Sequence, residues 1–325
     1  MQTKELAYAE QPPRAKKRKV KSEVRKNRML FLMMVPGLLV LFFNSYLPMA
    51  GLVMAFQKIN YRRFAFFGDW VGLKNLEVFF KSPFASILTR NTLLYNFMFI
   101  ILGTVVALFF SIALNELTGR MKSKVYQTIM FLPYFMSWVV ITYIVEAFLS
   151  ANYGYMNSTI LPIFGHQPVN WYATPKYWPV ILVLLNVWKS AGYNSVMYLA
   201  AITNLDQTYY EAARIDGATR MQQVFKITLP LLKPMIITLT LLSIGRVFNT
   251  DIGLFYSVPM IATNGGLMTT TSTIDTYVYI NLTNASAASV NIAAAAAFLQ
   301  SVLGFVLVLV TNAVTRKISA ENALF

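Results

Sequence analysis

Four ionisable side chains lie inside long apolar stretches of the sequence: Glu146, Lys189, Arg246 and Asp251. A charged side chain at the centre of a bilayer is unfavourable by about 2.5 to 3.5 kcal/mol, so each is expected to face other helices or water. Two roles fit such residues, either structural ion pairs between helices or contacts with a polar cargo. Arg246 and Asp251 are five residues apart and do not share one helical face, so their partners would come from other elements or another subunit.

Polar and aromatic residues recur at helical spacing around these charges and form two stripes. Aromatic faces combined with hydrogen-bonding groups suit a sugar, which has apolar C–H faces and many hydroxyls. The stripes are Tyr134, Trp138, Thr142 and Glu146, and then Asn186, Lys189, Ser190 and Tyr193. The predicted substrate path comprises Tyr134, Trp138, Glu146, Asn186, Lys189, Tyr193, Arg246, Asn249 and Asp251. Because its two cations are balanced by two anions, local charge does not decide whether the sugar is neutral or acidic.

Enzymatic chemistry is not indicated by this sequence. It contains no cysteine and one histidine, His166, which excludes thiolate metal sites and most zinc and Ser-His chemistry. A protease with two buried carboxylates would need Glu146 and Asp251, and neither lies in the Tyr-Asp or Gly-x-Gly-Asp setting of such proteases. No Gly-Lys-Ser/Thr phosphate loop occurs, so the chain is not expected to hydrolyse ATP. We therefore predict no catalytic residue, no metal site and no cofactor in this chain.

The composition is that of a membrane protein. Of the 325 residues 56% are hydrophobic and 13% are charged, and the mean hydropathy is +0.52, whereas about a quarter of the residues in soluble domains are charged. A membrane-spanning helix needs about 20 mostly apolar residues. Six stretches qualify, at 29–56, 91–115, 125–150, 177–201, 234–256 and 289–315. The sequence thus predicts an all-α membrane protein with six transmembrane helices in one domain over 29–315.

The distribution of basic residues predicts the orientation of the chain. Residues 1–28 hold ten Lys and Arg. The segments on the same side of the predicted spans as residues 1–28 contain nineteen Lys and Arg in all, and the segments on the other side contain seven. Both termini are therefore predicted to be cytoplasmic, with 1–28 as a basic tail and 316–325 as a short tail. The run Arg14–Lys21 resembles a nuclear localisation signal, but a basic tail before a first span is what the orientation rule requires. We predict contact of this tail with anionic membrane lipid and not with nucleic acid.

The connecting segment 202–233, here called the docking loop, has the pattern of a protein-binding surface. Tyr209–Asp216 predicts a short helix that is too polar for lipid, with small alanines beside charged residues. Gly217 can take the left-handed conformation that ends such a helix, and Ala218–Ile227 predicts a second, amphipathic helix. The loop is therefore expected to protrude from the cytoplasmic face and to dock another protein.

The docking loop resembles the signature of the membrane-spanning permease subunits of bacterial ABC importers. That signature reads E-A-A, three residues, G, nine residues, I-x-L-P, and it is matched by Glu211, Ala212, Ala213, Gly217, Ile227, Leu229 and Pro230. Phrases elsewhere resemble the carbohydrate-importer branch with its polysaccharide and oligosaccharide permeases, among them Trp70–Asn75, Phe131–Pro133 and Ile274–Tyr279. The likeness covers nearly the whole chain from residue 29, and within the branch the chain is similar to an alginate importer permease.

The resemblance implies partners and roles. An importer of this kind contains two permease subunits, usually non-identical, a dimer of cytosolic ATPases that bind ATP and magnesium, and an external solute-binding protein, in the bacterial inner membrane. The residues implied to couple to the ATPase are Tyr210, Glu211, Ala212, Ala213, Asp216 and Gly217. The implied cargo is an oligosaccharide, with an acidic, alginate-like sugar as one candidate. A permease for another solute class and a carrier or channel that works alone stay open, and a lone carrier would transport without ATP.

Overall fold

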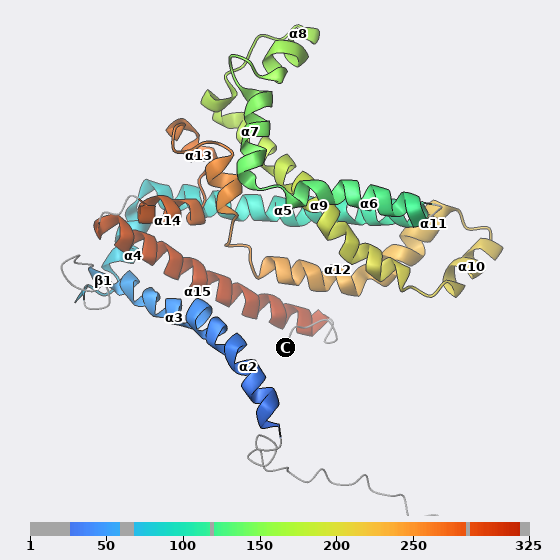
Figure 1. Ribbon diagram of the computed structural model, residues 1–325, viewed down its shortest axis with the longest axis horizontal. Coiled ribbons are helices and arrows are strands. Elements are labelled where there is room, and N and C mark those ends of the chain that lie inside the picture. The colour runs from blue at the N-terminus through green and yellow to red at the C-terminus, as the bar shows by residue number, and fades with distance from the viewer. Residues whose placement is uncertain (1–26, 59–67, 118–119, 284–286, 319–325) are drawn as a thin grey trace, which may run out of the picture. The chain divides into compact units, whose positions relative to one another are not determined.

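The computed structural model of the protein describes residues 27–58, 68–117, 120–283 and 287–318, and it is built almost entirely of helices (Figure 1). The chain divides into two compact units, one ending at Gly51 and the other beginning at Leu52. All but the last two residues of the predicted basic tail lie outside the described residues. The predicted C-terminal tail is described only as far as Ile318.

The first unit is a helix whose pitch changes along its length. It comprises α2 (Arg28–Leu41), a π-helical turn at Phe42–Tyr46 and the short helix α3 (Leu47–Met49). A 3₁₀ segment, Ala50–Phe56, leads on into the second unit. The helical stretch Arg28–Phe56 is long and apolar enough to cross a membrane, which agrees with the predicted first span.

Prolines explain where the helices widen. A proline lacks an N–H group, and its ring clashes with the carbonyl four residues earlier, so it disturbs the regular hydrogen bonding of a helix. Four π-helical turns among the described residues each end two residues before a proline, and they relieve this clash by moving the hydrogen bond one residue further back. The turns are Phe42–Tyr46, Met156–Ile160, Val224–Thr228 and Gly253–Ser257, and the prolines are Pro48, Pro162, Pro230 and Pro259.

Long helices run side by side through the second unit (Figure 1). α5 (Pro83–Glu116) packs along α9 (Trp178–Thr203), and α12 (Leu229–Ile244) packs against α15 (Ala287–Ile318). Four helical stretches of the described residues are long and apolar enough to span a membrane, and a bent helix pair could make a fifth. α9 is long enough to span a membrane, but it is not among these stretches, because its lysine and its asparagines lower its mean hydropathy. The all-α membrane architecture is confirmed, whereas the predicted number of six spans is not.

The predicted third span, 125–150, is not one helix. It is divided into α6 (Arg120–Phe135) and α7 (Trp138–Leu149), which are bent by 94° relative to each other. The hydroxyl of Ser137 accepts a hydrogen bond from the Val140 amide at 3.3 Å, as an N-cap does at the start of a new helix. The single stripe predicted along this span is therefore wrong, because its first residue lies on a different helix from the other three.

The predicted fifth span, 234–256, is displaced along the chain. The helix begins at Arg220, passes through a π-helical turn into α12 and ends at Ile244. Residues 245–248 form a turn, and 249–251 have no regular structure. The predicted path residues that follow α12 therefore stand at the end of a helix and not within one.

The remaining elements are short. β1 (Gln57–Lys58) pairs antiparallel with β2 (Asp69–Trp70). The short helices are α4 (Lys74–Lys81), α8 (Leu161–Ile163), α10 (Thr208–Ile215), α11 (Arg220–Gln223), α13 (Met268–Thr271) and α14 (Ile274–Thr283). Turns of 3₁₀ helix occur at Trp171–Ala173, Pro175–Tyr177 and Gly265–Leu267.

Two clusters of buried side chains hold the second unit together. The larger joins α7, α9 and the 253–257 turn around Trp178, which is fully buried. The smaller joins α4, α14 and α15 around Phe79, and the small side chains of Ala293 and Ala296 allow close approach to α15. This packing fixes the helices that carry the predicted site residues.

Candidate functional site

The docking loop folds as its pattern predicts, into two short helices around a glycine. Gly217 has φ = +76°, and the Ala218 amide donates a hydrogen bond to the Ala213 carbonyl at 2.8 Å across the end of α10. A Cβ at position 217 would meet no atom within 4 Å. Only the backbone conformation therefore requires glycine here.

The second helix of the loop is continuous with α12. The Thr219 hydroxyl accepts a hydrogen bond from the Gln222 amide at 3.3 Å, and the Gln222 side chain accepts one from the Thr219 amide at 2.8 Å. This reciprocal pair satisfies two amides that have no partner at a helix start. From Arg220 the chain stays helical to Ile244, so α11 and α12 belong to one continuous helical stretch.

One contact joins the two halves of the docking loop, and a second joins the loop to α5. The hydroxyls of Tyr210 and Thr228 share a hydrogen bond of 2.9 Å, and Thr228 is buried. Arg220 forms an ion pair with Glu116 at the end of α5, but both groups are exposed, and such surface pairs contribute little to stability. Tyr210, implied by the resemblance to couple to an ATPase, is therefore turned inward as a tether of α10.

Asp206 supports the start of α10. Its carboxylate accepts a hydrogen bond from the Thr208 amide at 2.9 Å, and the hydrogen bonds from Thr208 lower the pKa of Asp206 below its ordinary value. The carboxylate is therefore ionised at neutral pH and stabilises the first turn, where negative charge is favourable.

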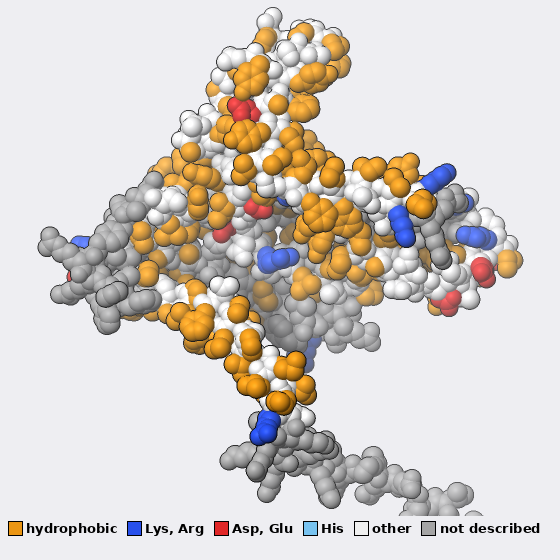
Figure 2. Space-filling view, viewed as in Figure 1, with side chains coloured by type: hydrophobic (Ala, Val, Ile, Leu, Met, Phe, Trp, Pro, Cys, Tyr) orange, Lys and Arg blue, Asp and Glu red, His pale blue; other side chains and the backbone are white. Residues whose placement is uncertain are grey.

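The outward face of α10 carries small, apolar and acidic side chains. Glu211, Ala212 and Asp216 are exposed, and Ile215 is 86% exposed. Figure 2 shows charged side chains gathered at the end of the second unit that holds α10 and α11. This face has the exposure that a protein-docking surface needs.

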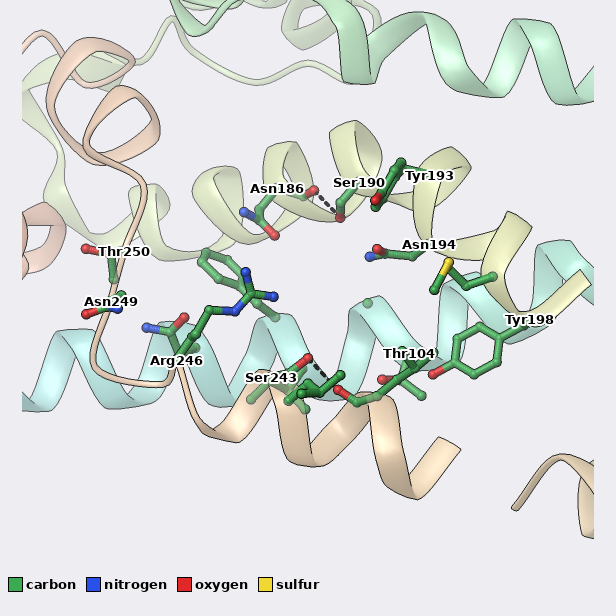
Figure 3. Close-up of a pocket in the computed structure, with 17 residues that line it drawn as sticks. Thr104, Asn186, Ser190, Tyr193, Asn194, Tyr198, Ser243, Arg246, Asn249 and Thr250 are labelled. Carbon is green, nitrogen blue, oxygen red and sulfur yellow. Dashed lines mark hydrogen bonds between the residues drawn. The ribbon is translucent and has the colours of Figure 1, made fainter. Parts of the chain in front are cut away.

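A polar cleft of about 520 Å³ lies between α5, α9 and α12 (Figure 3). α5 contributes Asn96, Phe99, Ile100, Gly103 and Thr104, and α9 contributes Asn186, Ser190, Tyr193, Asn194, Met197 and Tyr198. The third wall consists of Leu239, Leu242, Ser243, Arg246, Asn249 and Thr250. The three walls belong to elements that packing holds together, so the cleft is a built feature of the second unit.

The structure brings four of the nine predicted path residues to this cleft: Asn186, Tyr193, Arg246 and Asn249. It does not bring the other five to it, namely Tyr134, Trp138, Glu146, Lys189 and Asp251. Tyr134 does not line the cleft itself but supports a residue that does, because its ring stacks on that of Tyr193 with the centroids 4.5 Å apart.

Lys189 is bound to the end of α6. Its ammonium group donates hydrogen bonds to the carbonyls of Pro133 at 3.2 Å and Tyr134 at 3.0 Å, and also to the carbonyl of Met136. These carbonyls lie at the C-terminus of a helix, where a positive charge is favourable. Lys189 therefore stabilises the break between α6 and α7.

The two acidic residues are also engaged outside the cleft. Asp251 accepts hydrogen bonds from the Trp138 indole at 2.6 Å and the Gly253 amide at 2.8 Å. Glu146 accepts one from the Tyr153 hydroxyl at 2.8 Å. Within the described part of the chain no ion pair joins any two of the four charges singled out in the sequence, and no group of three His, Cys, Asp or Glu could hold a metal ion.

Several polar groups on the cleft are free to bind a ligand. The side-chain amides of Asn186 and Asn194 and the guanidinium of Arg246 form no hydrogen bond with any other described residue. Amides donate and accept hydrogen bonds, which suits hydroxyl groups, and a guanidinium donates only. The cleft can therefore bind a polyhydroxylated molecule and, at one point, an anion.

The segment after α12 is fixed by a hydrogen-bond network. Asp275 accepts hydrogen bonds from the Thr250 amide at 2.6 Å and the Thr250 hydroxyl at 2.9 Å through one oxygen, and from Gln300 at 2.9 Å through the other. Gln300 also donates to the Asn249 side chain at 2.6 Å. α14 and α15 thus position the wall that carries Arg246.

Sequence reasoning missed the contribution of α5 and part of that of α9. Asn194 follows Asn186 and Ser190 at intervals of four, so continuing the stripe by one turn would have found it. On α5, Asn96 and Thr104 are polar positions eight residues apart in a strongly apolar helix, which was a usable signal.

Comparisons with known proteins agree with this architecture. A sequence profile of the family described as binding-protein-dependent transport system inner membrane component matches residues 100–320. The polygalacturonan/rhamnogalacturonan transport system permease protein YteP of Bacillus subtilis is 30% identical over 309 residues, 94% of each chain. The trehalose/maltose transport system permease protein MalF of Thermococcus litoralis is 32% identical over 225 residues, 68% of this chain and 74% of the relative.

A solved structure extends the likeness to three dimensions. The crystal structure of a bacterial alginate ABC transporter in complex with an alginate pentasaccharide-bound periplasmic protein contains a similar chain, with a TM-score of 0.81 and 28% identity. The likeness covers 93% of this chain and 99% of that chain. The resemblance to carbohydrate-importer permeases predicted from the sequence is confirmed.

Proposed function

The chain belongs to the family of binding-protein-dependent transport system inner membrane components, and on that premise we propose that it is a membrane-spanning, non-catalytic subunit of an ATP-driven importer of oligosaccharides. The observation that carries the proposal is the direct connection between the cleft and the docking loop. The helix that lines the cleft with Ser243 continues without interruption back to Arg220 in the loop. A movement imposed on the loop therefore moves a wall of the cleft.

The chemistry of the cleft supports a sugar as cargo. Free amides at Asn186 and Asn194 can pair with hydroxyls, and the rings of Phe99 and Tyr193 can cover apolar sugar faces. A volume of about 520 Å³ is within the range of small-molecule sites. Relatives named for polygalacturonan and alginate transport support an acidic sugar, and the relative named for trehalose and maltose supports a neutral one.

The exposed face of α10 is the proposed contact with the partner ATPase, which would bind ATP and magnesium. Glu211, Ala212, Ala213, Asp216 and Gly217 form this contact, and the Tyr210 hydroxyl holds the helix in place. Further partners are a second, non-identical permease and an external solute-binding protein. Both termini lie in the cytoplasm, with the basic tail near anionic lipid and not bound to nucleic acid.

The proposal is tested by reconstituting the chain in vesicles with its ATPase, second permease and binding protein. Oligosaccharide uptake should require ATP on the ATPase side, and Glu211→Lys should lower both uptake and ATPase binding. Uptake without ATP would identify a lone carrier. Uptake of amino acids or peptides but of no sugar would reject a carbohydrate role, and full activity without the second permease would indicate a homodimer.

A further inference from the structure

Arg246 is the one charged residue among the described residues that line the cleft. In the sequence, two cations are balanced by two anions, but in the structure three of these four charged groups do not line the cleft. Lys189 is bonded to the end of α6, and Asp251 and Glu146 are bonded to aromatic side chains. The lining of the cleft therefore carries a surplus of positive charge.

Arg246 stands in the turn that follows α12, and its side chain extends from there into the cleft toward α9 (Figure 3). A basic residue at the C-terminus of a helix commonly bonds the last carbonyl groups of that helix. The Arg246 guanidinium forms no such bond and pairs with no other described residue. Its donors are therefore available to a ligand.

The described residues around Arg246 fix the wall that carries it but do not form an ion pair with its guanidinium. Asn249 and Thr250, the next lining residues, are fixed by the network of Asp275 and Gln300. One carboxylate oxygen of Asp275 accepts hydrogen bonds from Thr250 and the other accepts one from Gln300, and Asp275 does not line the cleft. The opposite wall, on α9, presents the free amides of the cleft.

We infer that Arg246 binds the carboxylate of a uronic acid unit and so makes the cleft selective for acidic over neutral oligosaccharides, an inference that rests on the proposed function. A guanidinium matches a carboxylate with two parallel N–H···O bonds, a geometry that a lysine cannot supply. Asn186 and Asn194 then pair with the neighbouring hydroxyls of the same sugar. Arg246 is the specificity-determining residue of this site.

The test compares a sugar with its own uncharged derivative. Trigalacturonate and its methyl ester share one skeleton, so the difference in their binding measures the carboxylates alone. Equilibrium dialysis against the complete purified transporter, without the solute-binding protein, removes that protein's own preference. The variants are Arg246→Gln, Arg246→Lys and, as a matched control, Lys74→Gln, which removes the same charge from an exposed position on α4.

Arg246→Gln should lower the affinity for trigalacturonate roughly 10- to 100-fold, the range of a charge-assisted hydrogen-bonded contact, and should leave the affinity for the methyl ester unchanged. Arg246→Lys should recover part of the loss, which also shows that the site folds. Lys74→Gln should change neither affinity once salt screens long-range attraction.

Three results would overturn the inference. Equal losses for both sugars in Arg246→Gln would make Arg246 a structural residue. A wild-type transporter that binds the methyl ester as well as the acid would remove the selectivity and leave carbohydrate transport standing. Binding of neither sugar, with ATP-driven uptake of a non-sugar solute intact, would reject the proposed function together with the inference.

Discussion

Lys189 illustrates how a single charged side chain can hold a broken helix. Its ammonium donates to three carbonyls at the end of α6 and lies 5.1 Å from the centroid of the Trp138 ring at the start of α7. Lys189→Met removes these bonds and leaves carbonyls without a donor, so we expect a loss of stability of roughly 1.5 to 3 kcal/mol. A lower thermal midpoint of the purified complex would report it.

Lys176→Met is the control for this variant, because Lys176 is exposed and its ammonium lies over the Tyr177 ring. The control should keep the thermal midpoint of the wild type. If Lys189→Met also kept that midpoint but lost sugar binding, Lys189 would belong to the substrate path, as the sequence alone predicted.

The sequence identifies the important charges but not their roles. Glu146, Lys189, Arg246 and Asp251 are conspicuous because ionised groups are rare in apolar stretches. Whether such a group faces a ligand or a carbonyl depends on which helix packs beside it. That is set by tertiary contacts between residues more than fifty positions apart, such as Lys189 and Pro133.

Gly217 allows a test in which contacts with neighbouring residues play no part. A non-glycine residue at φ = +76° is disfavoured by about 1 to 2 kcal/mol, and the surrounding space is open. Gly217→Val should therefore shift α10 and lower ATP-driven uptake and ATPase co-purification. Gly217→Asn, which tolerates this conformation, should retain most of both. Wild-type uptake in the valine variant would show that the turn does not position the docking surface.

At the scale of elements, the hydrogen bond between Tyr210 and Thr228 joins α10 to the helix that runs on into α12. If α10 transmits force through this bond, Tyr210→Phe should lower the sugar transported per ATP hydrolysed more than it lowers hydrolysis itself. Thr228→Val should do the same. The double variant should lose no more than either single one, with a coupling of about 0.5 to 1.5 kcal/mol. Strictly additive losses would mean that the two hydroxyls act independently.

The elements that were predicted well are those whose signals are local. The two helices of the docking loop were predicted from a glycine that ends the first helix and from the apolar face of the second. The third span was predicted as one helix because 125–150 is one long, mostly apolar stretch, and the stripe counted in fours along it assumed an unbroken axis. Pro133 and Ser137 lie at the break, but both residue types also occur within membrane helices, so these residues alone did not predict the 94° bend. The structure adds the packing of α6 against α9 and the hydrogen bonds from Lys189 to the end of α6.

At the scale of the whole molecule, composition and the loop signature were enough to predict a helical membrane permease, and the family profile agrees. The number of spans could not be predicted in the same way. α9 carries a lysine and several amides because it lines the cleft and caps α6, and these duties lower the hydropathy by which a span is recognised. The polar residues that give α9 its role thus make it harder to recognise as a membrane span from its hydropathy.

The orientation of the chain in the membrane was predicted from the distribution of its basic residues. It can be tested by labelling one position on each side of α9. The chain contains no cysteine, so one introduced thiol reports its own location. Ile163, before α9, is 71% exposed, and Ile215, after α9, is 86% exposed. The predicted orientation places the first outside and the second in the cytoplasm.

In spheroplasts that lack the partner ATPase, a membrane-impermeant maleimide should therefore label Ile163→Cys at once and Ile215→Cys only after permeabilisation. The reverse pattern would invert the orientation and place the docking loop outside, where no cytosolic ATPase could reach it. Labelling of both thiols from outside would mean that α9 does not cross the bilayer. Since α9 forms one wall of the cleft, that last result would also remove the cleft from any path through the membrane.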